Sequence, residues 1–267
     1  MQQATDFRAE CDALKALIAP LKDADFEKVT AFKDWTINDV MGHLHMWNRA
    51  AERALNAPEE FQEMLGRLLA FREKGGDMPT FEREWRGGIA GRELADAWAE
   101  TYAEVADVFA EADPSKRVPW GGPSMSARSS ISARLMETWA HGQEVYDVLG
   151  VVRQNADRIR NIVVLGVNTF GWTYACREET PPGPMPFVKL TAPSGEIWTY
   201  GEELPGERIE GLAEEFCQVV TQVRNIADTS LQVTGPVATD WMSKAQCFAG
   251  AASPPPAPGT RRTAKAA

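Results

Sequence analysis

The chain has 267 residues, of which 28 are Lys or Arg, 38 are Asp or Glu and 3 are His, so its formal net charge is −10. We therefore expect no nucleic-acid partner and no docking to an anionic membrane, because both require a basic surface. With 44% hydrophobic and 25% charged residues, the composition is that of a folded globular protein with one large domain or two ordinary ones.

We expect neither secretion nor membrane insertion. Its first ten residues are polar and lack the apolar core of a signal peptide. The longest apolar stretch, around Ile162 to Val167, is too short to cross a bilayer. The four cysteines form no Cys-x-x-Cys motif, which argues against a cysteine-rich zinc site or a thioredoxin-type redox site. We expect a cytoplasmic protein with reduced thiols.

Apolar residues recur at helical spacing through the first 150 residues. The pattern predicts that Thr36 caps a helix running to about Leu55, with Asp39 three residues after the cap, and that Gly150 ends the last helix of this region. Modest loops and the lack of strand patterns predict an antiparallel helix bundle. The predicted helices cover about residues 7–21, 37–55, 58–74, 94–109 and 126–149.

The second half of the chain combines helices with strands. A hairpin is predicted where residues 187–191 and 196–200 flank the turn sequence Ala-Pro-Ser-Gly, because both segments are rich in β-branched and aromatic side chains. Helices are predicted before and after this hairpin. They cover about residues 156–177, 207–223 and 236–248.

These patterns predict a mainly α protein with a C-terminal α+β unit. Residues 1–150 would form the helix bundle and residues 151–250 the α+β unit. Residues 251–267 (AASPPPAPGTRRTAKAA) are rich in Pro and lack large apolar side chains, so we expect a disordered tail there.

The three histidines, His43, His45 and His141, are candidate site residues because there are so few. Glu137 and His141 are four residues apart, so on a helix both point from one face. A bundle can bring His43 from an earlier helix to this pair. Two imidazoles and a carboxylate suit zinc foremost, with nickel, iron or manganese as alternatives, and three protein ligands leave a position open for catalysis. The same pair can also be a solvated acid and a hydrogen-bonded helix residue.

Residues near these candidates have two interpretations each. His43 and His45 are about 200° apart on a helix, so at most one should be a ligand. Asp39 lies one turn before His43 and would either orient its imidazole or simply cap the helix. Glu144 lies on the helix face of the predicted ligands and would be either a general base or an exposed acid.

Two segments of the first half carry a family resemblance, Trp35-Thr-Ile-Asn-Asp-Val-Met-Gly-His43-Leu and Ala133-Arg-Leu-Met-Glu137-Thr-Trp-Ala-His141-Gly-Gln-Glu-Val-Tyr-Asp-Val-Leu-Gly150. They resemble the N-terminal motif and the metal-ligand helix of the mycothiol-dependent maleylpyruvate isomerase family, within the DinB/YfiT-like metal-binding bundles. Downstream, Thr169-Phe-Gly-Trp172 and Trp241-Met-Ser-Lys-Ala-Gln-Cys-Phe-Ala-Gly250 look like a subgroup of uncharacterised metal-binding proteins. The C-terminal part of that subgroup is similar to the wyosine-base-formation domain and, more distantly, to sterol-carrier-like folds. The resemblance covers about residues 5–250.

The resemblance implies a DinB-like antiparallel four-helix bundle followed by a small sterol-carrier-like α+β domain. It implies that His43, Glu137 and His141 are the metal ligands. The family has an Asp three residues after the second histidine, and here Glu144, with a longer side chain, stands at that position in an acid–base role. Arg224 is the closest match to an arginine that the isomerase uses from its C-terminal domain.

The resemblance implies a metal- and thiol-dependent isomerase or transferase. A divalent metal would bind a low-molecular-weight thiol, such as mycothiol or glutathione, and lower its pKa. The thiolate would attack an electrophilic, anionic small-molecule substrate, while Glu144 manages the proton and Arg224 holds an anionic group. The alternatives are a non-catalytic metal-containing carrier for an acyl or isoprenoid ligand, and a metal-free interaction module. The expected oligomeric state is a monomer or a homodimer.

Overall fold

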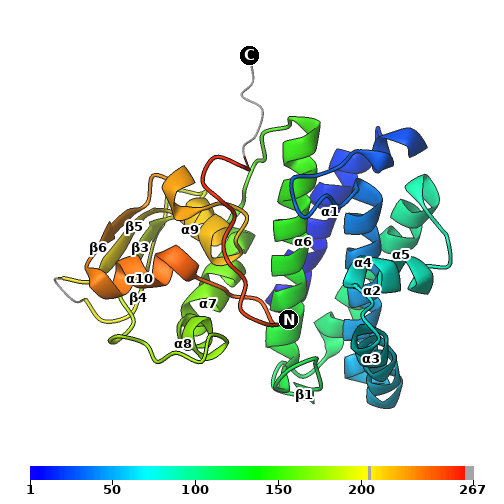
Figure 1. The fold of residues 1–267 in the computed structure, drawn as a ribbon, viewed down its shortest axis with the longest axis horizontal. Helices are drawn as coiled ribbons and strands as arrows, with labels where there is room; N and C mark the ends of the chain where they lie inside the picture. The colour runs from blue at the N-terminus through cyan, green and yellow to red at the C-terminus, as the bar shows by residue number, and fades with distance from the viewer. Residues whose placement is uncertain (204–205, 262–267) are drawn as a thin grey trace. The chain divides into compact units, whose positions relative to one another are not determined.

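The computed structural model describes residues 1–203 and 206–261 and divides the chain into two units, Met1–Leu149 and Gly150–Ala267 (Figure 1). The first unit consists of helices and a short two-stranded ribbon, and the second combines helices with a four-stranded sheet. The chain is therefore mainly α with a C-terminal sheet region, which confirms the predicted fold class at this level.

The first unit is built from helices that pack on one another. Helix α1 packs against α5 and α6, and α2 packs against the same two helices, while α3 and α4 cover α2. Strand β1 pairs with β2 in antiparallel fashion before α6 begins. The elements are α1 (Gln2–Ile18), η1 (Asp23–Glu27), α2 (Ile37–Asn56), α3 (Pro58–Glu73), α4 (Met78–Trp85), α5 (Gly91–Glu111), β1 (Arg117–Val118), β2 (Met125–Ser126) and α6 (Ala127–Leu149).

The start of α2 is fixed by a capping box. The Thr36 hydroxyl accepts a hydrogen bond from the backbone N–H of Asp39 at 3.1 Å, and the Asp39 carboxylate accepts one from the N–H of Thr36 at 3.1 Å. Both bonds satisfy N–H groups that have no partner inside the helix. The predicted cap at Thr36 is thus confirmed. Because it fixes where α2 begins, it also fixes the direction in which the side chains along α2 point.

Large apolar side chains fill the interior of the first unit. Phe7 and Leu14 of α1, Trp98 and Phe109 of α5, and Trp139 of α6 are all at most 1% exposed. Burying each such side chain stabilises the fold by roughly 1.5–3 kcal/mol. Close packing of this kind holds α6 against α1 and fixes the position of α5.

Helix α4 was not predicted from the sequence pattern. The Asp77 carboxylate caps its start by accepting from the N–H of Thr80 at 2.8 Å, and Pro79 occupies the first turn. Phe81 packs into a buried cluster with Met46 and Leu68. An eight-residue helix is too short to show a helical apolar period in sequence, so tertiary packing defines it.

The second unit is an α+β arrangement around one sheet, with strand order β4-β3-β5-β6. Strand β3 pairs antiparallel with β4 and parallel with β5, and β5 pairs antiparallel with β6. Helix α9 packs on β3 and β5, and α10 packs on β6. The elements are η2 (Asp157–Ile159), α7 (Arg160–Asn168), α8 (Phe170–Ala175), β3 (Phe187–Thr191), β4 (Ile197–Tyr200), β5 (Arg208–Leu212), α9 (Ala213–Val220), η3 (Ile226–Asp228), β6 (Gln232–Thr234) and α10 (Pro236–Lys244).

The predicted hairpin is confirmed as β3 and β4, but the three helices predicted around it differ from the structure. The helix expected over residues 236–248 ends at Lys244. The helix expected over residues 207–223 begins only at Ala213, because residues 208–212 form β5. Ile209 of this strand is fully buried. Pairing on both sides and burial of this residue outweigh local helix propensity. The helix expected over residues 156–177 is interrupted at Thr169, whose hydroxyl donates to the carbonyl oxygen of Leu165 at 2.8 Å.

The described part of the tail is attached to the second unit by hydrogen bonds. The carbonyl oxygen of Ser253 accepts from Arg177 at 2.7 Å and from Gln222 at 2.8 Å, and that of Pro256 accepts from Asn225 at 2.9 Å. Residues 251–261 therefore differ from the expected disordered tail, because their carbonyl groups find fixed donors. Residues 262–267, for which the same expectation was made, lie outside the described residues.

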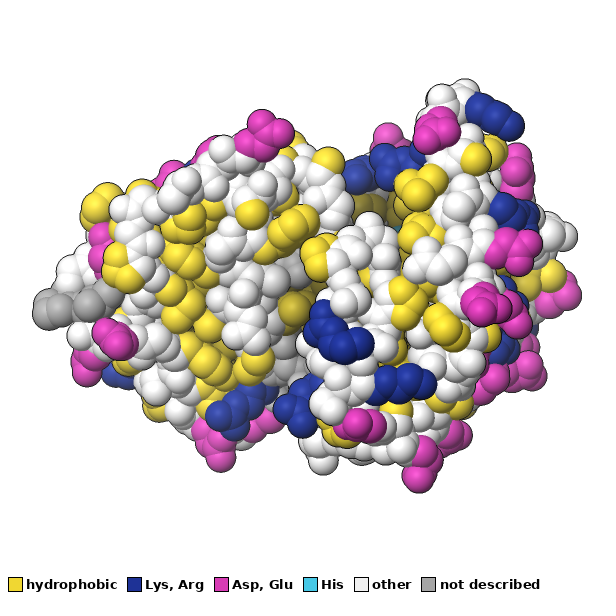
Figure 2. All heavy atoms as spheres, turned by 90° about the horizontal axis from the view of Figure 1, so that it is seen from below, with side chains coloured by type: hydrophobic (Ala, Val, Ile, Leu, Met, Phe, Trp, Pro, Cys, Tyr) yellow, Lys and Arg dark blue, Asp and Glu magenta, His cyan; other side chains and the backbone are white. Residues whose placement is uncertain are grey.

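The surface carries charges of both signs. Figure 2 shows acidic and basic side chains interspersed over the face that it draws, and a strip of hydrophobic side chains on the second unit, at the left. Among the helices of residues 1–203 and 206–261, none has the length and apolar character needed to cross a membrane.

We expect Thr36→Ala to lower the free energy of unfolding by about 1 kcal/mol, because it removes the hydroxyl that accepts from the N–H of Asp39 at 3.1 Å and donates to the Asp39 carboxylate at 2.8 Å. Urea unfolding followed by circular dichroism measures the loss. Thr36→Ser, which keeps the hydroxyl, is the matched control and should stay close to the parent protein. Equal unfolding midpoints for the alanine and serine variants would contradict the role given to the cap.

Candidate metal centre

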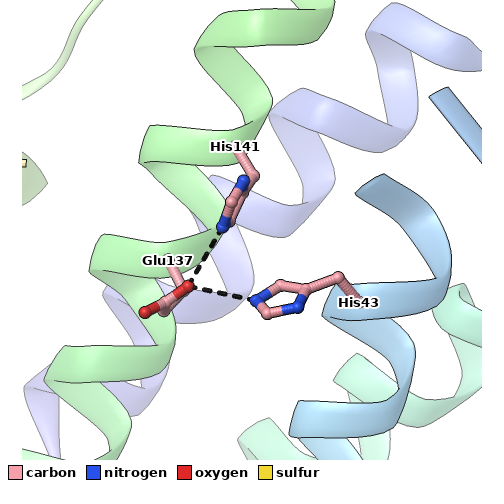
Figure 3. Close-up of side chains that lie close together, drawn as sticks. All are labelled: His43, Glu137 and His141. Atoms are coloured by element: carbon pink, nitrogen blue, oxygen red, sulfur yellow. Dashed lines mark hydrogen bonds and ion pairs between the residues drawn. The ribbon is translucent and has the colours of Figure 1, made fainter. Parts of the chain in front are cut away.

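Helices α2 and α6 bring together three side chains that are able to hold a metal ion. His43 comes from α2, and Glu137 and His141 lie one turn apart on α6 (Figure 3). One ligand atom from each residue lies within 4.8 Å of the others. The structure thus brings the three predicted ligands to one point.

The two imidazoles point at the same carboxylate oxygen. The Nε2 atom of His43 lies 3.3 Å from Oε2 of Glu137, and the Nε2 atom of His141 lies 3.2 Å from it. The side chains of His43, Glu137 and His141 are 13%, 23% and 13% exposed. The cluster is therefore mostly buried but still reachable from outside.

A second carboxylate, Glu82 of α4, holds the other side of His43. Its Oε1 lies 2.7 Å from Nδ1 of His43 and accepts a hydrogen bond from Nε1 of Trp47 at 3.1 Å. Glu82 is 3% exposed. With Nδ1 donating to Glu82, the Nε2 of His43 faces Glu137, which is the arrangement that metal-bound histidines adopt.

A positive charge is favoured between His43 and Glu137. When His43 is neutral and donates through Nδ1, its Nε2 lone pair faces a carboxylate oxygen, and only a cation between them makes the contact favourable. Burial lowers the pKa of His43, but the charges of Glu82 and Glu137 outweigh burial and raise it to about 9. A proton on Nε2 and a metal ion are therefore alternative occupants of the same position.

The pKa values of the other two residues fit this description. Burial lowers the pKa of His141 and the charge of His43 adds to that effect, although Glu137 opposes it. Burial raises the pKa of Glu137, but the hydrogen bonds from both imidazoles hold it well below its ordinary value. His141 is thus a neutral imidazole and Glu137 a carboxylate at neutral pH, which are the forms that bind metals.

Two nitrogens and one oxygen form a donor set that fits a divalent transition metal. Zinc in enzymes binds such sets of three protein ligands and keeps a further position for water or substrate. The same donors also suit nickel, iron or manganese. The residues present therefore fit the metal predicted from the sequence.

Aromatic side chains wall the cluster. The ring of Trp35 stacks on His141 with a centroid distance of 5.6 Å and an interplanar angle of 8°, and its centroid lies 5.3 Å from that of His43. Phe32 meets His141 edge-on at 5.1 Å. Both aromatic residues belong to the loop that leads into α2, closed by the bridge between Val29 and Thr36. This wall restricts ring rotation and strengthens electrostatic interactions by displacing water.

Of the two interpretations of Asp39, the structure supports helix capping. Its carboxylate accepts a hydrogen bond from the backbone N–H of Thr36. It also accepts two from Arg83, with Nε 2.9 Å from Oδ1 and Nη2 2.9 Å from Oδ2. Burial raises the pKa of Asp39, but Arg83 and Thr36 lower it overall. The other interpretation, in which Asp39 orients His43, does not hold, because Glu82 lies at Nδ1 instead.

His45 takes no part in the cluster. Its ring packs against Trp85 with a centroid distance of 5.2 Å. Burial, with a smaller effect from the charge of Arg49, lowers the pKa of His45 to about 4. This residue is therefore a neutral core histidine, in keeping with the expectation that only one of His43 and His45 is a ligand.

Of the two other predicted site residues, one shares a helix with two of the ligands and the other belongs to the second unit. Glu144 is on α6, three residues after His141, and is 2% exposed. Arg224 belongs to the second unit, is 7% exposed, and donates to the carbonyl oxygen of Val223 at 3.0 Å. Their roles stay predictions.

Glu82 is the site residue that sequence reasoning missed. The available signal was the start of its helix, where Asp77 precedes Met78-Pro79 in the pattern of a cap followed by proline in the first turn. That signal predicts a helix but not the direction of a carboxylate on it. Only the packing of α4 on α2 brings Glu82 to His43.

Comparisons with known proteins agree with this geometry. The family model for the mycothiol maleylpyruvate isomerase N-terminal domain matches residues 7–146. An uncharacterized protein of Mycobacterium tuberculosis, found in two strains, is 36% identical over 245 residues, covering 92% of this chain and 94% of the relative.

Solved structures show the same fold. The crystal structure of the mycothiol-dependent maleylpyruvate isomerase matches with a TM-score of 0.54 and 13% identity, covering 82% of this chain and 87% of that one. A mutant of that enzyme with one histidine changed to alanine matches with a TM-score of 0.50 and 14% identity, over the same shares of both chains. At this level of identity, the likeness is one of fold.

We expect Glu82→Gln to weaken metal binding about 10–100-fold, because the carboxylate that orients and polarises His43 is lost. Competition with a chelating dye for zinc measures the change. Glu84→Gln, on the same helix but exposed, is the matched control and should leave the affinity unchanged. Equal affinities for the two variants would remove Glu82 from the site.

In the metal-free protein, we expect nuclear magnetic resonance of the labelled imidazoles to give three separate pKa values, about 9 for His43, about 4 for His45 and one below 6.5 for His141. Because the folded-state pKa of His43 is raised, its contribution to stability is fully present below about 6.5 and is lost as the pH rises through about 9. A value near 6.5 for His43 would contradict the carboxylate arrangement.

Proposed function

The chain belongs to the family of the mycothiol maleylpyruvate isomerase N-terminal domain, and from this premise we propose that it is a metal- and thiol-dependent isomerase or transferase. Its substrate would be an electrophilic, anionic small molecule. The observation that carries the proposal is the convergence of His43, Glu137 and His141 within 4.8 Å. A site with three protein ligands leaves a position for an exogenous ligand, as catalytic sites do.

The roles of the chain's own residues follow from their positions. His43, Glu137 and His141 would hold the metal, and Glu82 would fix the His43 ring with Nε2 directed at it. A bound divalent metal lowers the pKa of a coordinated low-molecular-weight thiol and so supplies a nucleophile at neutral pH. Trp35 would restrict access of water to this position.

Two residues would act on protons and substrate. We assign to Glu144 the transfer of a proton, because a buried carboxylate one turn beyond a ligand on the same helix suits a general base. Arg224 would hold an anionic group of the substrate through its guanidinium. Both assignments are taken from the family pattern.

The finer architectural assignments are proposals as well. We propose that α1, α2, α5 and α6 are the DinB-like antiparallel four-helix bundle, over residues 1–150. Residues 151–250 would be the sterol-carrier-like, wyosine-base-formation-like domain. Zinc as the metal and a cytoplasmic location stay predictions.

The metal can be tested directly. Untagged protein purified without chelator should carry about one equivalent of metal per chain, and His141→Ala should abolish it. His45→Gln is the matched control, because it alters a histidine outside the cluster and should keep full metal content. Metal-free wild-type protein that also fails to bind added zinc or cobalt would refute the proposal.

Thiol and catalytic roles need separate measurements. Adding mycothiol to the cobalt-substituted protein should change the visible spectrum, because a thiolate would enter the coordination sphere. With maleylpyruvate as the probe substrate, Glu144→Gln should keep this spectral change but lower kcat, and Arg224→Met should mainly raise KM. A spectrum that ignores mycothiol would refute the thiol role, and thiol binding without turnover of any electrophile would favour the carrier function.

A further inference from the structure

Arg134 places a full positive charge inside the first unit. Its side chain is 2% exposed, and its Nε donates to Oδ1 of Asn48 at 3.0 Å. Within the described residues, its Nη2 has no hydrogen-bond partner and its guanidinium forms no ion pair. A buried cation without a carboxylate beside it is unfavourable, so a more distant negative charge must compensate for it.

Arg134 lies on the same pair of helices as the metal ligands. On α6 it precedes Glu137 by three residues, which makes the two positions neighbours on the helix surface. Its hydrogen-bond partner Asn48 follows His43 by five residues on α2 and is fully buried. Burial lowers the pKa of Arg134, whereas the charges of Glu137 and Glu82 act in the opposite direction.

Cys11 of α1 is the other ionisable group that acts on Arg134. Its Sγ lies 3.8 Å from the Thr138 hydroxyl, which itself donates to the carbonyl oxygen of Arg134 at 2.9 Å. Burial raises the pKa of the Cys11 thiol well above its ordinary value. Cys11 is therefore uncharged, and the compensating charges are those of Glu82 and Glu137.

The charges around the site have a simple consequence. Arg134 makes the site one unit more positive than the carboxylates and the metal alone would make it. A loaded site with Arg134 therefore attracts an anionic ligand more strongly than the same site without it. A neutral ligand gains nothing from this extra charge.

We propose that Arg134 adds one unit of positive charge to the field at the metal site, so that the loaded protein prefers a monoanionic ligand, of which a thiolate is an example, over a neutral one. Arg134 is thus a positioning residue that acts through the site's field, without touching the ligand. This inference rests on the proposed metal binding. In a poorly hydrated site, one unit of charge has a large effect on the affinity for an anion.

Cobalt-substituted protein titrated with azide, and followed by its visible spectrum, tests this inference. Arg134→Met should weaken azide binding at least tenfold and, at the same time, strengthen binding of the cobalt ion. Opposite changes for anion and cation are expected only if charge is the cause, because a loss of structure would weaken both. Arg134→Lys should restore both affinities toward wild type.

A second variant leaves Arg134 in place. Asn48→Asp puts a carboxylate on the guanidinium and should produce the same pair of opposite changes. Arg128→Met, on the exposed part of α6, is the matched control and should change neither affinity.

The outcomes separate this inference from the function on which it rests. Azide and cobalt affinities that stay at the wild-type level in Asn48→Asp and Arg134→Met would overturn the inference, as would a joint loss of both affinities in Arg134→Met alone. Wild-type protein that binds no cobalt would overturn the proposed function and this inference together.

Discussion

The hydrogen bond between His43 and Glu82 is the interaction on which the candidate site depends. It fixes Nδ1 of the imidazole as the donor, and so leaves Nε2 to face Glu137 at 3.3 Å. Because Glu82 is supplied by α4, the site is made by three helices, although only two carry the ligands. The short helix α4 packs on α2 through Phe81 and Met46, which links the geometry of the site to the apolar packing beside it.

Charge is the second constraint on the site. Two carboxylates sit among aromatic rings, where an uncompensated negative charge is unfavourable. A proton on His43 provides one compensating charge and a divalent metal would provide two, so metal uptake would release the proton. Arg134 and its hydrogen-bond partner Asn48 also affect the charge of the site, although they lie one turn or more from the candidate ligands along α6 and α2. The net charge of the site therefore depends on residues further along α2 and α6 as well as on the three candidate ligands.

Much of this was accessible from the sequence. The cap at Thr36, the helical face from Leu94 to Phe109 and the β3–β4 hairpin follow from local patterns, and the ligand trio follows from spacing and family resemblance. The exceptions have a common physical origin. Strand β5 and helix α4 are short elements defined by their neighbours, and Glu82 reaches His43 only through the packing of α4. A single sequence contains the propensities of such elements but not the contacts that decide between them.

The stacking of Trp35 on His141 has an optical consequence. Its indole is 8% exposed and in ring contact with both candidate histidine ligands. A protonated imidazole quenches the fluorescence of an adjacent indole, and a paramagnetic ion such as Co²⁺ quenches it more strongly, whereas Zn²⁺ does not. In a variant that keeps Trp35 and replaces the nearby Trp47, the indole emission would report whether a proton, a closed-shell metal or an open-shell metal occupies the position between His43 and Glu137.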